Sequence, residues 1–235
     1  MAKTNTAAVE RFAGFADGEA RFFRALARNQ SREWFAAHRD EYDQGWLRPM
    51  QALLHEARER IAPFFTREDL APPKVFRIHR DVRFSKDKSP YKTHIGGLVP
   101  IAGTGGGPGA TCAVYFHVAA DELFLASGQY VMDGSQLQQF RAALLDERRG
   151  NEVGRLLGKL TRAGFTVGSY DELQRVPRGF DPDHPRAALL KRKGLIVAAP
   201  PPARSLLVSR KLVDHLVAQV KRAAPLVEWL AAVTA

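Results

Sequence analysis

Three short stretches decide the fold: HIGGLVPI at residues 94–101, TCAVYFHV at 111–118 and ELFLAS at 122–127. Each has the length and apolar content of a strand bounded by turn residues. The glycine-rich run Gly103–Gly109 connects the first two stretches, and a turn at Ala120-Asp121 connects the last two. Short strands that follow one another through turns rather than through helices pair antiparallel. The centre of the chain therefore predicts an antiparallel sheet.

Further elements are expected on both sides of this centre. Apolar and polar residues alternate over residues 74–84, which predicts a strand, and the apolar run 195–199 predicts another. In the N-terminal part, helices are expected at about residues 15–29, after the N-cap Ser31, and from Pro49 to Ile61. In the C-terminal part, a helix is expected at 135–147, with Asp133 or Ser135 as its cap. Further helices are expected at 151–163, 183–193, 205–222 and 225–233. The pattern indicates an α+β fold, with an antiparallel sheet of about four to six strands covered by N- and C-terminal helices. We expect a single domain over residues 12–234 after a flexible N-terminus at residues 1–11.

The composition is that of a globular protein. Of 235 residues, 45% are apolar and 26% are charged, so the chain can bury a core. A single cysteine, Cys112, excludes an internal disulfide framework and a cysteine-rich zinc site, and we expect it to be buried in a strand. The chain has no apolar stretch of about 18 residues and no secretory signal at its start. These features predict a soluble cytoplasmic protein with no membrane partner.

Positive charge is concentrated in one segment. The chain has 35 basic and 25 acidic residues and a formal net charge of +10. Residues 74–93 contain seven basic side chains and two acidic ones, which is half of the excess. The basic residues of this segment are Lys74, Arg77, Arg80, Arg83, Lys86, Lys88 and Lys92, and the acidic ones are Asp81 and Asp87. Clustered charge creates a local positive potential, which attracts anions.

The two faces of the predicted strand 74–84 differ in polarity. Side chains alternate between the faces of a strand, so Arg77, His79, Asp81 and Arg83 share one fully polar face. Arg80 falls among the apolar residues of the other face. An unpaired guanidinium is costly to bury. Arg80 therefore either pairs with a carboxylate of a covering helix, such as Glu33 or Asp40, or contacts a ligand.

These patterns lead to a first hypothesis, a binding protein or enzyme for a small ligand that carries a phosphate or carboxylate. Arginine binds such groups through two parallel hydrogen bonds, and lysine supplies a point charge. The candidate anion-binding residues are Arg77, Arg80, Arg83, Lys86, Lys88, Lys92 and Arg178. The candidates for proton transfer are His79, Asp81 and Tyr91. Two alternatives stay open: a nucleic-acid-binding module, and a module that docks an acidic protein partner.

No cofactor or metal is expected. The phosphate-binding pattern Gly-x4-Gly-Lys-Ser/Thr is absent, and the run Gly103–Gly109 contains no lysine, so we interpret that run as a mobile connection. His79, His94 and His117 lie on predicted strands and could converge. The histidines nevertheless form neither a His-x-His nor a His-Glu-x-x-His motif, so the sequence favours no metal site.

Four blocks of the sequence together resemble the family catalogued as domain of unknown function 2461. The blocks are Phe22-Phe23-x2-Leu26-x2-Asn29-x4-Trp34-Phe35, Lys74–Thr93, Leu123–Tyr130 with Leu137 and Arg141, and Arg175-x-Pro-x-Gly-Phe-Asp-x-Asp-His-Pro185. The resemblance spans about residues 12–230. Gln30 stands where a second asparagine is usual in the family. The resemblance implies a soluble protein of one domain and implies no particular activity.

Overall fold

A computed structural model describes residues 11–67, 69–101 and 111–235 of the chain. The flexible N-terminus expected at residues 1–11 lies outside the described residues except for Arg11, and so does the connection Gly103–Gly109. None of the described helices is long and apolar enough to cross a membrane.

The centre of the described chain is one six-stranded sheet with the order β1-β2-β3-β4-β6-β5, in which every neighbouring pair is antiparallel. The strands are β1 (Lys74–Val75), β2 (His94–Pro100), β3 (Cys112–Ala119), β4 (Leu123–Gln129), β5 (Thr166–Gly168) and β6 (Leu195–Ala198). The α+β class and the antiparallel sheet predicted from the sequence are confirmed.

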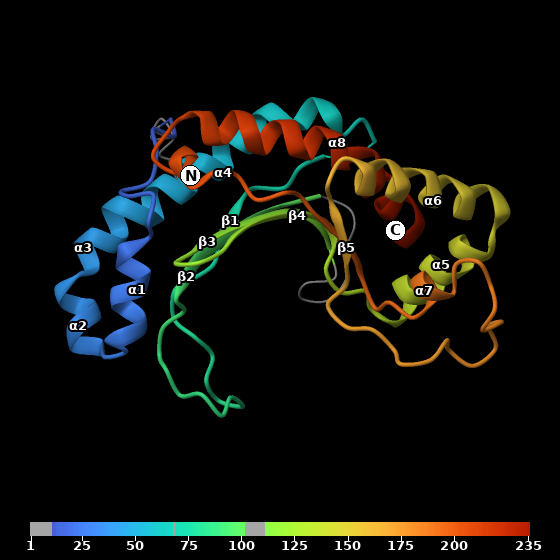
Figure 1. Cartoon of the computed structure of the whole chain (residues 1–235), viewed down its shortest axis with the longest axis horizontal. Helices are drawn as coiled ribbons and strands as arrows, with labels where there is room; N and C mark the ends of the chain where they lie inside the picture. Colours follow the sequence, from blue (N-terminus) through green and yellow to red (C-terminus); the bar gives the residue numbers. More distant parts are fainter. Residues whose placement is uncertain (1–10, 68, 102–110) are drawn as a thin grey trace, which may run out of the picture.

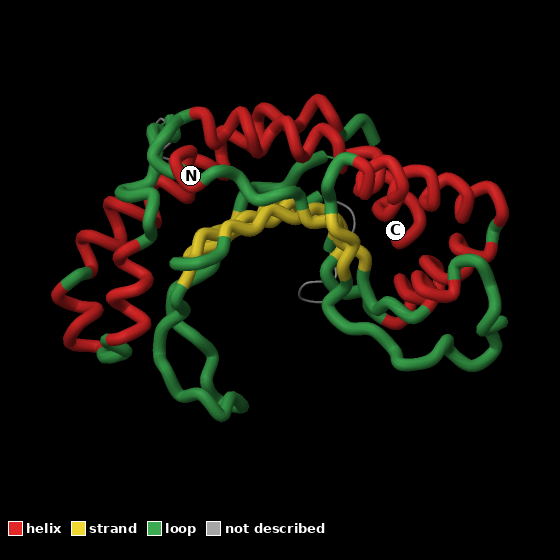
Figure 2. The backbone as a smooth tube through the Cα atoms, in the orientation of Figure 1, coloured by secondary structure: helices red, strands yellow, loops and turns green. Residues whose placement is uncertain are grey.

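Helices cover only one face of this sheet. Along β3, Cys112, Val114, Phe116 and Val118 are buried, whereas the residues between them are only partly buried. The buried face packs against α4 (Arg48–Ile61) and α8 (Lys211–Thr234), which lie along the convex side of the curved sheet in Figure 1. None of the described helices lies over the concave face (Figure 2). Side chains on that face, Tyr115 and His117 among them, are therefore available to a ligand.

The other helices lie beyond the two ends of the sheet (Figure 1). One end holds α1 (Arg21–Arg28), α2 (Arg32–Ala37), α3 (Arg39–Tyr42) and the π-helical turn η1 (Asp43–Leu47). The other end holds α5 (Gly134–Leu145), α6 (Glu147–Arg162) and α7 (Ala187–Leu190). Two short 3-10 turns are η2 (Ala62–Phe64) and η3 (Arg204–Leu206). Two predicted caps are confirmed. Ser31 accepts a hydrogen bond from the Trp34 backbone, and Asp133 forms a capping box with Gln136.

The predicted strand 74–84 is wrong beyond Val75. After Phe76 the chain leaves the sheet, and residues 76–93 form a long hairpin on the concave side (Figure 1), which we call the basic hairpin. Its two arms are held by a single bridge between His79 and Tyr91 and by a few backbone hydrogen bonds. Apolar and polar residues do alternate along this segment. Beyond the sheet, however, no further strand pairs with the two arms of the hairpin to cover an apolar face. Phe84 is consequently 96% exposed.

The two helices predicted at 205–222 and 225–233 are one helix, α8, which continues through Pro225. Proline removes one backbone hydrogen bond and disfavours a helix interior. The residues that follow compensate, because Leu226, Val227 and Leu230 are fully buried. Burial of these side chains favours continuation of the helix over a break.

Two further differences concern short elements. Asp183 does not cap a helix, because α7 begins only at Ala187, after Arg186. The strand β5 was not predicted, since three residues are too few to show a period. It pairs with β6 at the edge of the sheet and places Val167 opposite Val197.

The contact between α4 and the sheet yields a test. A methyl group on Gly97 would lie 2.5 Å from Leu54 Cδ1 and 2.7 Å from the Lys74 carbonyl oxygen. We expect Gly97→Ala to lower the free energy of unfolding by about 1–3 kcal/mol, because overpacking forces neighbours apart. The control is Gly154→Ala on α6, where no atom lies within 4 Å. Helix propensity should make that variant more stable by up to about 1 kcal/mol. Equal urea midpoints for the two variants would contradict this description of the interface.

Candidate functional site

A groove of about 640 Å³ lies between the helices at one end of the sheet and the segment Pro73–His79. Its lining residues are Phe35, Arg39, Tyr42, Asp43, Leu47, Arg48, Gln51, Ala52, His55, Pro73, Val75, Phe76, Arg77, Ile78 and His79. They come from α2, α3, η1, α4 and the chain that leads from β1 into the basic hairpin. The groove thus combines apolar side chains with a small set of charged ones, as ligand sites do.

The charges of the groove are mostly positive. Three arginines line it, Arg39, Arg48 and Arg77, against one carboxylate, Asp43. Asp43 is already paired with Arg39, at 3.4 Å from Nε. Among the described residues, neither Arg48 nor Arg77 has an ion pair or a side-chain hydrogen bond. Both guanidinium groups therefore add to the positive potential of the groove, and the charge of Arg77 also acts on Asp81 in the hairpin.

Tyr42 contributes a neutral hydroxyl to the lining. Burial of its side chain, together with the nearby charge of Asp43, raises the pKa of Tyr42 to about 12. The phenol consequently stays protonated at neutral pH and adds no negative charge to the groove.

Several charged side chains of the basic hairpin have their partners within the hairpin itself. Arg80 pairs with Asp87, Arg83 pairs with Asp81 at 2.7 Å, and Lys88 donates to the Val82 carbonyl at 2.9 Å. The partner expected for Arg80, a carboxylate such as Glu33 or Asp40, is therefore wrong. Because the hairpin extends beyond the sheet, its own turn supplies the nearest carboxylate. Three of the candidate anion-binding residues thus already have partners in the hairpin.

The three residues predicted for proton transfer have different surroundings. Tyr91 is buried, with its ring stacked on Phe35 at 4.5 Å, and its backbone N–H donates to Gln30 Oε1 at 3.1 Å. Gln30 thus fastens the base of the hairpin to the loop before α2. The carboxylate of Asp81 is occupied by Arg83. Of the three, only His79 lines the groove.

The remaining predicted residues do not gather at the groove. Lys86 is exposed in the hairpin, and Lys92 lies over the ring of Phe76, with Nζ 5.4 Å from its centre. Arg178 lines a separate hollow together with Arg175 and Lys191. Of the ten candidates, the structure brings Arg77 and His79 together in the groove.

Six polar groove residues were not predicted from the sequence: Arg39, Tyr42, Asp43, Arg48, Gln51 and His55. They lie on helices, where a lone charged side chain looks like ordinary solvated surface. The only sequence signal was that Arg48 and His55 are seven residues apart, which places them on one helix face.

Of the three histidines on predicted strands, two lie near each other. The rings of His94 and His117 lie 5.3 Å apart on the concave face of the sheet, whereas His79 faces Phe35 and Tyr91. No group of three or more metal-binding side chains is found in the described part of the chain.

The ion pairs of the hairpin predict a pH response. Hydrogen bonds from Arg83 lower the pKa of Asp81 from 3.8 to about 2, and bonds from Ser89 and Arg80 hold the pKa of Asp87 further below its usual value. Depressed carboxyl pKa values mean that both pairs are fully present above pH 3.8 and are lost as the pH falls through the folded-state values. We expect a carbon NMR titration to place the midpoint of Asp81 well below 3.8, and Arg83→Gln to return it toward that value. A normal midpoint in the unaltered protein would show that the Arg83 pair does not persist in solution.

Comparisons with known proteins bear on the family of the chain. A family model described as "Conserved hypothetical protein (DUF2461)" matches residues 19–229, which is most of the sequence. A search of curated proteins finds no match. The matched span includes the helices that form the groove, the basic hairpin and the whole sheet. The chain therefore belongs to the family of conserved hypothetical proteins known as domain of unknown function 2461.

Proposed function

We propose that this protein binds a small anionic ligand, bearing a phosphate or carboxylate, in the groove between α4 and the segment Pro73–His79. The observation that carries the proposal is the pair Arg48 and Arg77, which line one groove without a carboxylate partner among the described residues. Charges left unpaired in a partly enclosed site favour a negatively charged occupant.

The rest of the lining supports a ligand with an apolar part. Phe35, Leu47, Ala52, Val75 and Ile78 contribute apolar surface beside the guanidinium groups. A molecule that carries an anionic head and a short apolar body would satisfy both kinds of surface. Of the residues predicted for proton transfer, His79 is the one that lines the groove, where its imidazole can act as a general acid or base toward such a ligand. The proposal therefore extends to an enzyme, in which His79 is the residue to test for turnover.

The proposal is tested by thermal unfolding with inorganic phosphate and with benzoate, at constant ionic strength. A ligand at 100 times its Kd stabilises the native state by about 2.7 kcal/mol. A hydrogen bond to a charged group contributes about 1.5–3 kcal/mol, so Arg48→Gln and Arg77→Gln should each raise Kd about tenfold or more.

The matched control is Lys86→Gln, which removes one exposed positive charge outside the groove. It should retain the full stabilisation by ligand. The proposal fails if Lys86→Gln abolishes the effect while the double variant Arg48→Gln, Arg77→Gln keeps it.

One observation favours a second candidate, a nucleic-acid-binding module. Phe84 is 96% exposed, and the guanidinium carbon of Arg83 lies 5.8 Å from the centre of its ring. An exposed ring among cations can stack on an unpaired base while the cations contact phosphates. We expect a single-stranded oligonucleotide then to bind with steep salt dependence, and Phe84→Ala to weaken binding by about 1–3 kcal/mol.

Fluorescence anisotropy with a labelled oligonucleotide measures this affinity, and Tyr170→Ala is the control for loss of an exposed ring elsewhere. Equal affinities of the two variants would exclude base stacking by Phe84. Docking of an acidic protein partner relies on the cations alone, so Phe84→Ala would leave that interaction unchanged.

A further inference from the structure

The concave face of the sheet holds a chain of hydrogen bonds between three titratable side chains. His117 Nε2 lies 3.2 Å from Glu122 Oε2, and His117 Nδ1 lies 3.0 Å from the hydroxyl oxygen of Tyr115. Tyr115 and His117 alternate with buried residues on β3, and Glu122 follows the turn into β4. A hydroxyl, an imidazole and a carboxylate in this order is the arrangement by which a base activates a nucleophile.

The chemistry of the three groups fixes the direction of the hydrogen bonds. A carboxylate only accepts, so Nε2 of His117 carries a hydrogen and donates it to Glu122. In the neutral ring Nδ1 is then an acceptor, and the Tyr115 hydroxyl donates to it. Burial lowers the pKa of His117 and raises the pKa of Tyr115 to about 12. At neutral pH the imidazole is therefore free to accept a proton that the phenol still holds.

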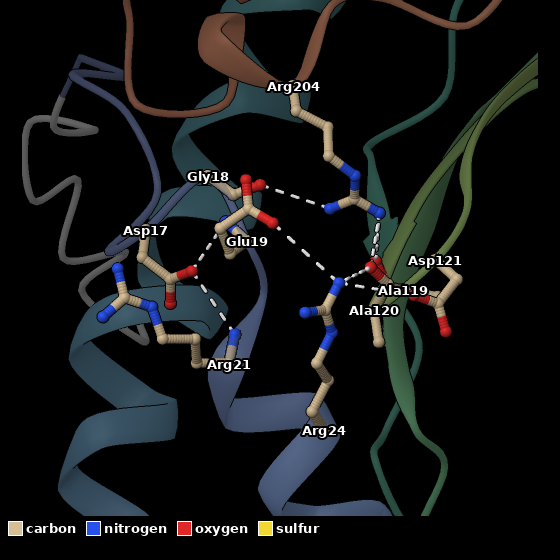
Figure 3. Close-up of polar contacts among 9 residues, drawn as sticks. All are labelled: Asp17, Gly18, Glu19, Arg21, Arg24, Ala119, Ala120, Asp121 and Arg204. Atoms are coloured by element: carbon tan, nitrogen blue, oxygen red, sulfur yellow. Dashed lines mark hydrogen bonds and ion pairs between the residues drawn. The ribbon is translucent and has the colours of Figure 1, made fainter.

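Two features of the backbone hold this arrangement in place. Gly96 is directly opposite His117 on β2, and a methyl group there would lie 2.8 Å from the Tyr115 hydroxyl. The backbone carbonyl of Glu122 closes the turn by accepting a hydrogen bond from the Ala119 N–H at 2.8 Å. Two arginines from other parts of the chain also hold this turn. The guanidinium groups of Arg24 and Arg204 both donate hydrogen bonds to the Ala120 carbonyl, as Figure 3 shows.

Positive charge lies beside the chain of hydrogen bonds. Lys92 lies over Phe76, whose ring centre is 6.2 Å from that of Tyr115. Burial lowers the pKa of His94, whose ring is 5.3 Å from that of His117, and the positive charges of His117 and Lys92 lower it further. A negatively charged substrate would be attracted here, and negative charge that develops on it would be stabilised.

We propose that Tyr115 is a catalytic nucleophile toward phosphate esters, with His117 as its general base and Glu122 as the positioning residue. The Tyr115 oxygen attacks phosphorus and the bond from phosphorus to the leaving oxygen breaks. The phenol proton passes to His117 Nδ1 and then to the leaving oxygen. Water next attacks the phosphotyrosine, His117 accepts its proton, and that proton returns to Tyr115 as it leaves. This site shares only Phe76 with the groove, so it does not rest on the proposed anion site there.

Reactivity of Tyr115 can be measured with 4-(fluorosulfonyl)benzoate, an anionic probe that transfers its sulfonyl group to oxygen and releases fluoride. Mass spectrometry gives the labelling rate at each tyrosine. We expect Tyr115 to react faster than the exposed Tyr130 and Tyr170, and His117→Gln to slow it about a hundredfold. Glu122→Gln should slow it several-fold at an unchanged melting temperature, because that side chain is largely exposed.

The dependence of the labelling rate on pH distinguishes a base-assisted Tyr115 from an ordinary phenol, and this test needs no variant. The titratable and charged groups around His117 and Tyr115 are Glu122, His94, Lys92 beside His94, and Tyr130, whose charge acts on Tyr115. Once His117 is neutral, the Tyr115 rate should stay level from about pH 7 to 8.5, whereas unassisted phenols should gain about tenfold per pH unit below their pKa. A Tyr115 rate that climbs like those of Tyr130 and Tyr170, and is no faster, would overturn the proposal.

The substrate class is tested with bis(4-nitrophenyl) phosphate. A burst of nitrophenolate with a phosphate adduct on Tyr115, absent in Tyr115→Phe, would support a phosphate ester. Labelling of Tyr115 by the sulfonyl fluoride with no phosphate adduct and no nitrophenolate release would overturn that class.

Discussion

The structure depends on one constraint: the described helices pack against only one face of the central sheet. Packing of α4 and α8 against Ile95, Val114 and Phe116 provides the apolar burial that holds the strands in register. Because side chains alternate, the same register places His94, Tyr115 and His117 on the face that no helix covers. The core and the concave surface are thus two consequences of the same pairing of strands.

The basic hairpin shows that charge in a sequence is not the same as charge available to a ligand. Arg80 and Arg83 are paired with Asp87 and Asp81. A hairpin that extends beyond the sheet has little apolar contact to order it, so these internal pairs and hydrogen bonds supply its structure. Arg77 lies at the hairpin base, where it lines the groove beside α4, and it has no ion pair among the described residues.

Much of the fold could be predicted because it is encoded locally. The strands around Val114 and Leu125, the cap at Ser31 and the capping box at Asp133 follow from period and residue type. The continuity of α8 through Pro225 could not be predicted, because it depends on what the following residues pack against. The candidate site was predictable only in part for the same reason. Arg77 and His79 belong to the basic segment, but Arg48 meets them only through the packing of α4 beside β1.

The concave face illustrates the same limit. Tyr115 and His117 are two residues apart in a strand, and Glu122 follows the next turn, so the sequence places all three near one another. It does not say which face of the sheet is left uncovered. A cover of helices on both faces, which the sequence also allowed, would have made Tyr115 and His117 core residues.

We propose that the groove, rather than the exposed part of the hairpin, is the anion site. The most direct measurement is the anomalous scattering of selenate soaked into a crystal of the protein. If the groove binds anions, a selenium peak should lie between the guanidinium groups of Arg48 and Arg77. A peak only beside Lys86 and Lys88, with none in the groove, would contradict it.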